Sequence, residues 1–235
     1  MLAMTATPQP LFETTNIPPP KIKHGATGDP MVNQGTHVVV SIYAPREDLF
    51  LEGDEASHLL ELTEGVICAY RLLPDGQRHV VSFYFPGDLI GYCCSGNHTF
   101  SAQALNKVRA RRIPRILVNN LVETQTGFAR RLLKLASEEL TMTREHLLCV
   151  AAKSAEARMA VFLLALSRRN ALAGGDASRI ELPMTRVDIG DYLGLTIETV
   201  SRTFSKLKRS GVIALPRTTV VIIRDAKELD LLANG

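Results

Sequence analysis

The spacing of hydrophobic and polar positions is most informative near the carboxyl end of the chain. Between Thr185 and Val212, apolar residues recur with the period of about 3.6 residues that is typical of amphipathic helices. They form two short groups on either side of Gly194: Ile189, Tyr192 and Leu193, then Ile197, Val200, Phe204 and Leu207. Two amphipathic helices joined by so short a turn predict a helix-turn-helix.

The residues around the turn support this prediction. Gly194 can adopt the left-handed conformation that ends a helix, and Thr196 can cap the free backbone donors that open the next one. Gly211 is placed to end the second helix. Local chemistry and periodicity therefore agree on the same motif.

The second helix should present a polar face opposite its apolar stripe, because residues three and four apart are neighbours on a helix. That face contains Glu198, Ser201, Arg202, Ser205 and Arg209. No acidic residue occurs from Thr199 through Arg224, and the basic residues of that stretch are Arg202, Lys206, Lys208, Arg209, Arg217 and Arg224. This local bias, which the net charge of +3 conceals, favours contact with a phosphate backbone. The alternative is an ordinary solvated basic face.

An earlier part of the chain has the signature of short strands. The predicted strands are 36–43, 66–72, 78–85, 100–104 and 107–113. Glycines punctuate this region at intervals of 12, 11 and 11 residues, at Gly53, Gly65, Gly76 and Gly87. This turn spacing is typical of an all-β sandwich or barrel.

Between these regions the pattern is helical from about Val118 to Arg169. Leu133, Leu140 and Leu147 recur every seven residues, with Ala136, Thr143 and Val150 between them, as in a coiled-coil seam. A helix packed on its own β domain would show similar spacing, so the pattern leaves dimerisation open. After the helix-turn-helix, strands at 212–215 and 219–223 predict a wing with Arg217 at its tip.

Composition limits the remaining possibilities. The chain of 235 residues is 46% hydrophobic, which suffices for two domain cores, and it contains neither a secretory signal nor a membrane-spanning run, so a cytoplasmic protein without membrane contact is expected. Residues 1–34 hold six of the twelve prolines and predict a flexible arm. The adjacent Cys93 and Cys94 could form a redox switch, although free cysteine more often acts as a small hydrophobe.

The segment Asp188-Ile-Gly-Asp-Tyr-Leu-Gly-Leu-Thr-Ile-Glu-Thr-Val-Ser-Arg202 closely resembles the DNA-binding signature of the CRP/FNR family of bacterial transcription regulators. Its Glu-x-x-Ser-Arg resembles the FNR/FixK branch. The resemblance extends from about Gly35 onward and implies an α+β fold: a double-sheet β jelly roll at 35–117, a dimerisation helix at 118–152 and a winged helix-turn-helix at 153–235. It also implies a homodimer, with Leu133, Leu140, Thr143, Leu147 and Val150 at its interface.

The resemblance further implies how DNA is recognised. Glu198, Ser201 and Arg202 would contact base edges of a TTGA half-site paired with TCAA. Thr185, Arg186, Thr196 and Thr199 lie where relatives contact phosphates, and Lys206, Arg209 and Arg217 extend the same basic surface. Some FixK-type proteins carry a redox-reactive cysteine at the position of Thr185, so thiol control at that site is not expected here.

The signals used by relatives are not evident. No arginine follows Gly91 where a cyclic phosphate would need its partner, and the arm lacks the cysteines that ligate an iron-sulfur cluster. We therefore expect no cofactor and no metal. The resemblance to the FNR/FixK branch implies an activator that recruits RNA polymerase to genes of low-oxygen metabolism or nitrogen fixation. The alternatives are a ligand-, haem- or redox-gated regulator and a repressor. An enzyme is not expected, because no catalytic constellation is present.

Overall fold

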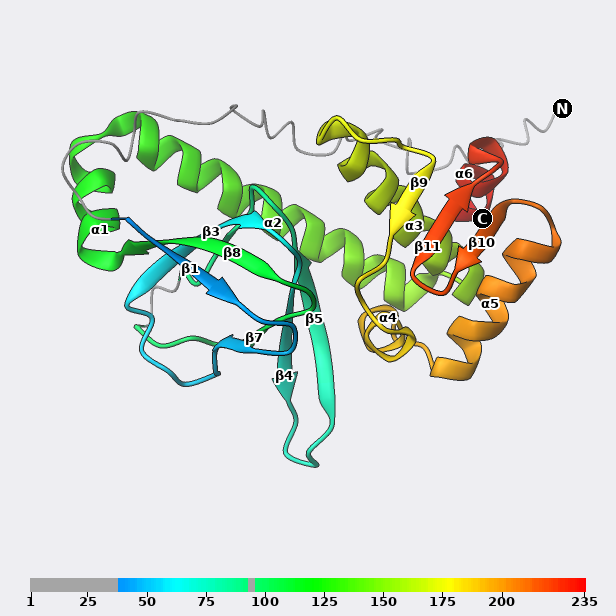
Figure 1. The fold of residues 1–235 in the computed structure, drawn as a ribbon, viewed down its shortest axis with the longest axis horizontal. Helices are drawn as coiled ribbons and strands as arrows, with labels where there is room; N and C mark the ends of the chain where they lie inside the picture. Colours follow the sequence, from blue (N-terminus) through cyan, green and yellow to red (C-terminus); the bar gives the residue numbers. More distant parts are fainter. Residues whose placement is uncertain (1–37, 93–95) are drawn as a thin grey trace, which may run out of the picture.

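A computed structural model describes residues 38–92 and 96–235 of the chain (Figure 1). The predicted arm at 1–34 and the pair Cys93 and Cys94 lie outside the described residues. The amino-terminal part is a β domain of two four-stranded antiparallel sheets. One sheet contains β1 (Val39–Tyr43), β8 (Val108–Pro114), β3 (His58–Glu64) and β6 (Leu89–Ile90); the other contains β2 (Asp48–Phe50), β7 (Ser101–Ala104), β4 (Ile67–Leu72) and β5 (Arg78–Tyr84).

The sheets enclose an apolar core in which Leu62, Ile67 and Val108 are almost fully buried. The five predicted strands are confirmed with small shifts at their ends, whereas β2, β3 and β6 were not predicted. β3 has the sequence His-Leu-Leu-Glu-Leu-Thr-Glu, and its leucines and glutamates favour helices over strands. Pairing with β8 and β6, which lie elsewhere in the sequence, therefore determines its conformation.

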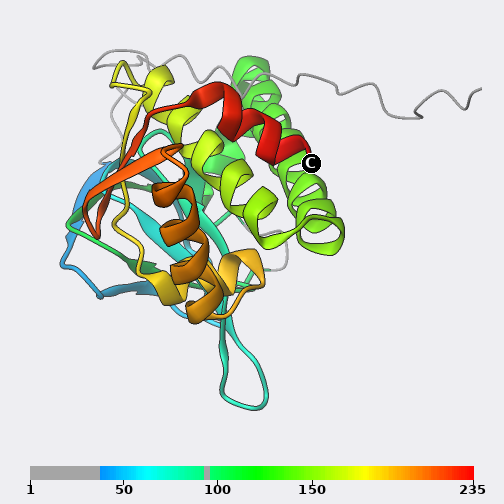
Figure 2. The same cartoon turned by 90° about the vertical axis from the view of Figure 1, so that its right-hand side faces the viewer.

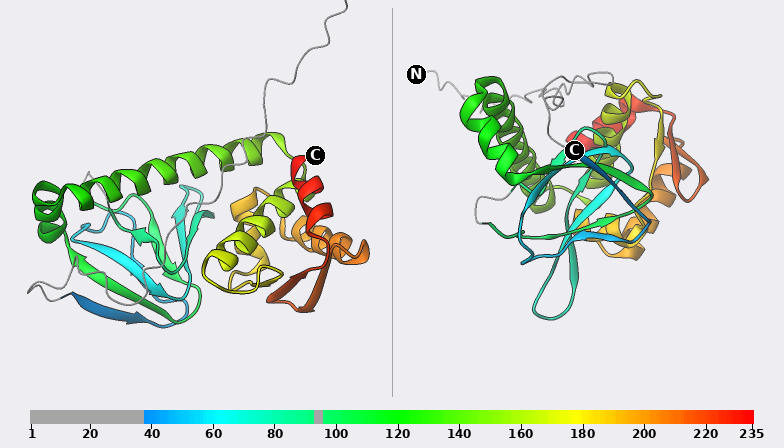
Figure 3. Two further views of the ribbon diagram at one scale, coloured as in Figure 1. Left: turned by 90° about the horizontal axis from the view of Figure 1, so that it is seen from above. Right: turned by 60° about the vertical axis from the view of Figure 1, so that its left-hand side comes forward.

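The helical region divides into three elements. They are α1 (Arg115–Thr124), α2 (Thr126–Ala152) and α3 (Ala155–Leu172). The break at Gln125 was not predicted. The second break falls at the boundary expected after residue 152, and there the Ser154 hydroxyl accepts a hydrogen bond from the backbone N–H of Ala157. Figure 3 shows α2 running along the β domain as far as the C-terminal domain.

The C-terminal domain comprises α3 and the elements that follow it. These are β9 (Arg179–Glu181), α4 (Arg186–Leu193), α5 (Ile197–Arg209), β10 (Ile213–Arg217), β11 (Val220–Ile223) and α6 (Ala226–Asn234). The strands form a sheet in the order β10-β11-β9, which confirms the predicted wing and adds β9. The short helix α6 was also not predicted. It packs on α3, and its Leu229 is buried in a core that continues into the β domain.

Candidate nucleic-acid interface

The first helix of the motif begins with a capping box. The Thr185 hydroxyl oxygen accepts a hydrogen bond from the backbone N–H of Asp188 at 3.1 Å, and Asp188 Oδ2 accepts from the Thr185 backbone N–H at 2.9 Å. Oδ2 also accepts from the Thr185 hydroxyl at 2.7 Å. The hydroxyl and amide protons of Thr185 are thus already engaged, and helix geometry gives the backbone N–H groups of Arg186 and Val187 in the first turn no acceptor within the helix.

Two glycines allow the helices to approach closely. Gly194 ends α4 in the left-handed conformation at φ 64°, as predicted. Gly190 lies inside α4, and a Cβ atom there would stand only 2.6 Å from the backbone oxygen of Leu195. The Thr196 hydroxyl then caps α5 by accepting a hydrogen bond from the Thr199 N–H at 3.2 Å. The turn is therefore fixed on both sides.

Helix α5 has two chemically distinct faces. Val200, Thr203, Phe204 and Leu207 are buried against the rest of the domain. Glu198, Ser201, Arg202, Ser205 and Arg209 are all exposed. The structure thus brings the three predicted base-reading residues together on one accessible face.

The charges on this face are available for polar contacts. Hydrogen bonds with its own backbone N–H and with Thr196 hold the pKa of Glu198 below its ordinary value, so this side chain is an anionic acceptor at neutral pH. Arg202 donates to the Thr199 hydroxyl oxygen at 3.2 Å, which orients its guanidinium along the helix. The Glu198 carboxylate, which accepts hydrogen bonds, and the Arg202 guanidinium, which donates them, therefore stand one helical turn apart. Both groups are of the kinds that recognise base edges.

The predicted phosphate-contacting residues differ in their availability. Arg209 and Arg217 are exposed. Lys206 forms an ion pair with Glu156 of α3 at 2.5 Å, so its charge is partly compensated within the protein. The Arg186 guanidinium lies 3.6 Å from the centre of the Phe204 ring and donates to the Thr218 carbonyl oxygen in the wing at 3.1 Å. Burial lowers the pKa of Arg186, which nevertheless remains charged.

One exposed residue was misassigned from the sequence. Ile197 was predicted to belong to the buried stripe of the second helix, but its side chain is 43% exposed beside Glu198. The first helical residue has no preceding turn to cover it, so periodicity overestimates burial there. Its position between Thr196 and Glu198 adds an apolar surface to the exposed face of α5.

The predicted dimer seam lies on α2. Leu133, Leu140 and Leu147 are 72%, 50% and 67% exposed, and Thr143 is exposed with them. Val150 is only partly exposed, because it lies beside Gly194 at the turn between α4 and α5. A row of leucines left open to solvent on a long helix is typical of a surface that another protein covers.

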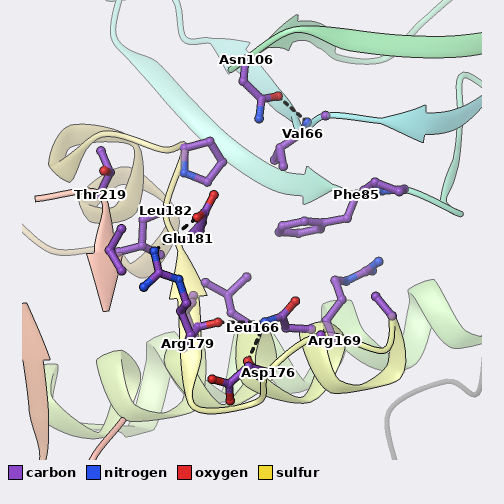
Figure 4. A pocket seen from close by; sticks show the side chains of 18 of the residues that line it. Val66, Phe85, Asn106, Leu166, Arg169, Asp176, Arg179, Glu181, Leu182 and Thr219 are labelled. Atoms are coloured by element: carbon purple, nitrogen blue, oxygen red, sulfur yellow. Dashed lines mark hydrogen bonds and ion pairs between the residues drawn. The ribbon is translucent and has the colours of Figure 1, made fainter. Parts of the chain in front are cut away.

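A cleft of about 680 Å³ separates the β domain from the C-terminal domain (Figure 4). Its floor is apolar and includes Phe85 and Leu166. Two of the polar side chains around it have partners within the protein: Arg169 binds Asp88 through two nitrogens at 3.1 Å, and Asn106 accepts from the Val66 N–H at 2.8 Å.

Within the ranges 38–92 and 96–235, no cluster of three or more potential metal ligands occurs. Over the same ranges no helix is long and apolar enough to cross a bilayer. The two described cysteines, Cys68 and Cys149, are buried free thiols.

Comparison with known proteins identifies both domains. Residues 157–232 match the Crp-like helix-turn-helix domain, and residues 40–125 match the cyclic nucleotide-binding domain. The nitrogen fixation regulation protein FixK of Bradyrhizobium diazoefficiens is 39% identical over 79% of this chain and 78% of its own length. The chain belongs to the CRP/FNR family. It is thus a helix-turn-helix DNA-binding regulator rather than an enzyme, and α4 and α5 are its helix-turn-helix.

Two further CRP/FNR proteins support the placement in the FixK group. The transcriptional activatory protein AadR of Rhodopseudomonas palustris is 37% identical over 81% of this chain and 80% of its own length. The structure of FixK2 from Bradyrhizobium japonicum superposes with a TM-score of 0.79 at 31% identity, covering 84% of this chain and 98% of that one. The predicted fold class is confirmed by this agreement.

Residues of the β domain match the cyclic nucleotide-binding domain, but their described part lacks an arginine where the cyclic phosphate would be expected. No arginine lies among residues 96–104, in the segment leading into β7 and in β7 itself. His98 is instead buried and stacks on Phe50 with ring centres 3.6 Å apart. The described part of this segment therefore offers a cyclic phosphate no arginine as a charged partner.

Proposed function

We propose that this protein acts as a homodimer that binds an inverted-repeat operator through α5. The observation that carries the proposal is the accessible triad Glu198, Ser201 and Arg202 on a helix whose opposite face is fully packed. Arg202 would donate to O6 and N7 of guanine, and Glu198 would accept from the amino group of cytosine or adenine. Ser201 is small enough to let the helix approach the bases. The operator expected for this triad is TTGA paired with TCAA.

The surrounding residues would position the helix on the duplex. The exposed face of α5 that carries the triad is bordered by Thr196, Thr199, Arg209 and Arg217. Lys206 joins them once its bond to Glu156 is exchanged for a phosphate. Thr185 would act mainly by holding the capping box, which aims the amides of Arg186 and Val187 at a phosphate. The Arg186 side chain would fix the wing against α5. Ile197 could contact a thymine methyl group.

The dimer would form along α2. Leu133, Leu140, Thr143 and Leu147 would pack on the same residues of the second copy, and Val150 would support the turn beside them. A two-fold axis along this helix would place two copies of α5 in successive major grooves, about 34 Å apart. The exposed leucines support this arrangement, because burying them stabilises the dimer by about 25 cal/mol per Å² of apolar surface.

We further propose an activator that recruits RNA polymerase at genes of nitrogen fixation or low-oxygen metabolism. The names of its relatives, a nitrogen fixation regulation protein and a transcriptional activatory protein, support this role. The described residues of the β domain contain no arginine among 96–104 and no group of three potential metal ligands. We propose that the amount of protein sets its activity.

Binding of the protein purified in air, without added ligand, to a TTGA/TCAA duplex and to a scrambled duplex tests this proposal. Fluorescence anisotropy at one fixed salt concentration is suitable, because non-specific binding depends steeply on salt. We expect selective binding to the inverted repeat. Equal affinity for both duplexes would contradict the proposal and would direct attention to an effector of the β domain.

A further inference from the structure

The hairpin of β4 and β5 lies beside α4, the first helix of the DNA-binding motif (Figures 1 and 2). Arg78 opens β5 and extends its guanidinium to α4, where Nη1 lies 2.7 Å from Asp188 Oδ1. Its Nη2 lies 3.2 Å from Cys68 Sγ, and its charge stands over the Tyr70 ring at 4.4 Å. These contacts on three sides fix the orientation of the guanidinium.

The two carboxylate oxygens of Asp188 accept hydrogen bonds from different parts of the protein. Oδ1 accepts from Arg78 of the β domain, and Oδ2 accepts from the hydroxyl and the backbone N–H of Thr185. Burial disfavours the charged form of Asp188, yet the hydrogen bonds from Thr185 and Arg78 hold its pKa below the ordinary value. The same carboxylate therefore closes the capping box and ties the first turn of α4 to the β domain.

Apolar packing continues this connection along the helix. Tyr192 of α4 packs on Phe83 of β5 with ring centres 5.2 Å apart, and on His146 of α2 at 4.1 Å. Val80 and Phe83 belong to the same buried cluster as Ile189 and Leu193 of α4. The hairpin thus supports α4 along its length, and Arg78 reaches the first turn of the helix, at which the phosphate contact is proposed.

We infer that Arg78 is a positioning residue for DNA binding, which acts through Asp188 to fix the phosphate-facing first turn of α4 although it lies in the β domain. The inference rests on the proposed function, because it requires that this turn meets a phosphate. Hydrogen bonds to phosphate weaken steeply with misalignment. A displacement of the first turn would therefore reduce the affinity for any duplex and leave the base contacts of α5 intact.

The test compares the variants Arg78→Ala, Arg78→Lys and Asp188→Asn of the full chain with the unaltered protein. Arg71→Ala is the matched control, since Arg71 lies on the same hairpin but pairs with Glu52 of the β domain and does not reach α4. Asp188→Asn keeps an oxygen for the Thr185 N–H and removes the charge that binds Arg78. Circular dichroism melting establishes which variants fold.

Anisotropy titrations with TTGA/TCAA and scrambled duplexes over a range of salt concentrations give affinity, selectivity and salt slope. We expect Arg78→Ala to weaken binding to both duplexes about three- to tenfold, with the ratio between them preserved. The slope of log K against log salt should stay nearly unchanged, because the contacts that are lost are made by uncharged backbone amides and not by Lys or Arg side chains. Arg78→Lys should recover part of the lost affinity.

If Arg78 acts through Asp188, the two losses should not add. The double variant Arg78→Ala/Asp188→Asn should then bind DNA as tightly as the weaker-binding of the two single variants. Equal behaviour of Arg78→Ala and Arg71→Ala would overturn the inference, as would tighter binding or a loss of selectivity alone. Should Arg78→Ala fail to fold, Arg78→Lys and Asp188→Asn decide the question by the same loss of affinity for both duplexes. Unselective binding by the unaltered protein would instead refute the proposed function.

Discussion

Replacing Gly190 by alanine tests whether close approach of the two helices determines the stability of the DNA-binding motif. An alanine in an exposed helix interior stabilises by about 1 kcal/mol relative to glycine. At Gly190 the new Cβ would stand 2.6 Å from the backbone oxygen of Leu195 and 3.5 Å from the Val200 side chain. Overpacking of this kind costs about 1 to 3 kcal/mol, and a backbone atom cannot rotate away.

The overpacking cost less the helix gain leaves a net loss, and we therefore expect Gly190→Ala to lower the free energy of unfolding by up to about 2 kcal/mol. Gly127→Ala is the matched control, because Gly127 also lies within a helix but a Cβ there meets no atom within 4 Å. That change should stabilise by about 0.5 to 1 kcal/mol, so the two substitutions have opposite signs. Urea unfolding at equal protein concentration measures both, since dimer stability depends on concentration. A Gly190→Ala protein as stable as the Gly127→Ala protein would refute the steric reasoning.

Four further changes have defined outcomes. Arg202→Ala should remove about 1 to 3 kcal/mol of discrimination between matched and mutated half-sites in anisotropy titrations, and unchanged discrimination would contradict the base-reading role. Leu140→Glu should shift the protein to monomer in sedimentation velocity and abolish operator binding, because a charge would be buried in the seam; a stable dimer would place the interface elsewhere. Glu156→Gln should tighten operator binding, because Lys206 then meets a phosphate without first giving up its ion pair; an unchanged affinity would show that Lys206 does not meet DNA. The pKa of Asp188 is lowered in the folded state, so the charged form of Asp188 stabilises the fold above its unfolded pKa of about 4. This stabilisation is lost as the pH falls through the folded pKa. In urea unfolding, the free energy of unfolding should therefore fall less on acidification for Asp188→Asn than for the unaltered protein.

The helix-turn-helix could be predicted from the sequence because its signals are local. Gly194, Thr196 and the apolar period of α5 lie within one short stretch, and each favours the same structure. By contrast, β3 could not be predicted, since its leucines and glutamates favour a helix and only pairing with distant strands makes it extended.

The role of Arg78 was equally inaccessible to sequence reasoning. It is separated from Asp188 by 110 residues, and nothing in the local pattern of either residue indicates the other. Val150 also has a contact that heptad spacing does not indicate, because its side chain lies beside Gly194. Ile197 shows that a helical period alone does not predict burial in the first turn of a helix, where no preceding turn covers the side chain.

The uncovered leucines of α2 have a consequence for the response of a promoter. If two copies must meet before both half-sites can be filled, dimer concentration rises with the square of the monomer concentration while monomers predominate. A twofold rise in synthesis would then raise operator occupancy about fourfold at low occupancy. Leu133, Leu140 and Leu147 would thus convert a modest change in expression into a threshold, without any ligand in the β domain.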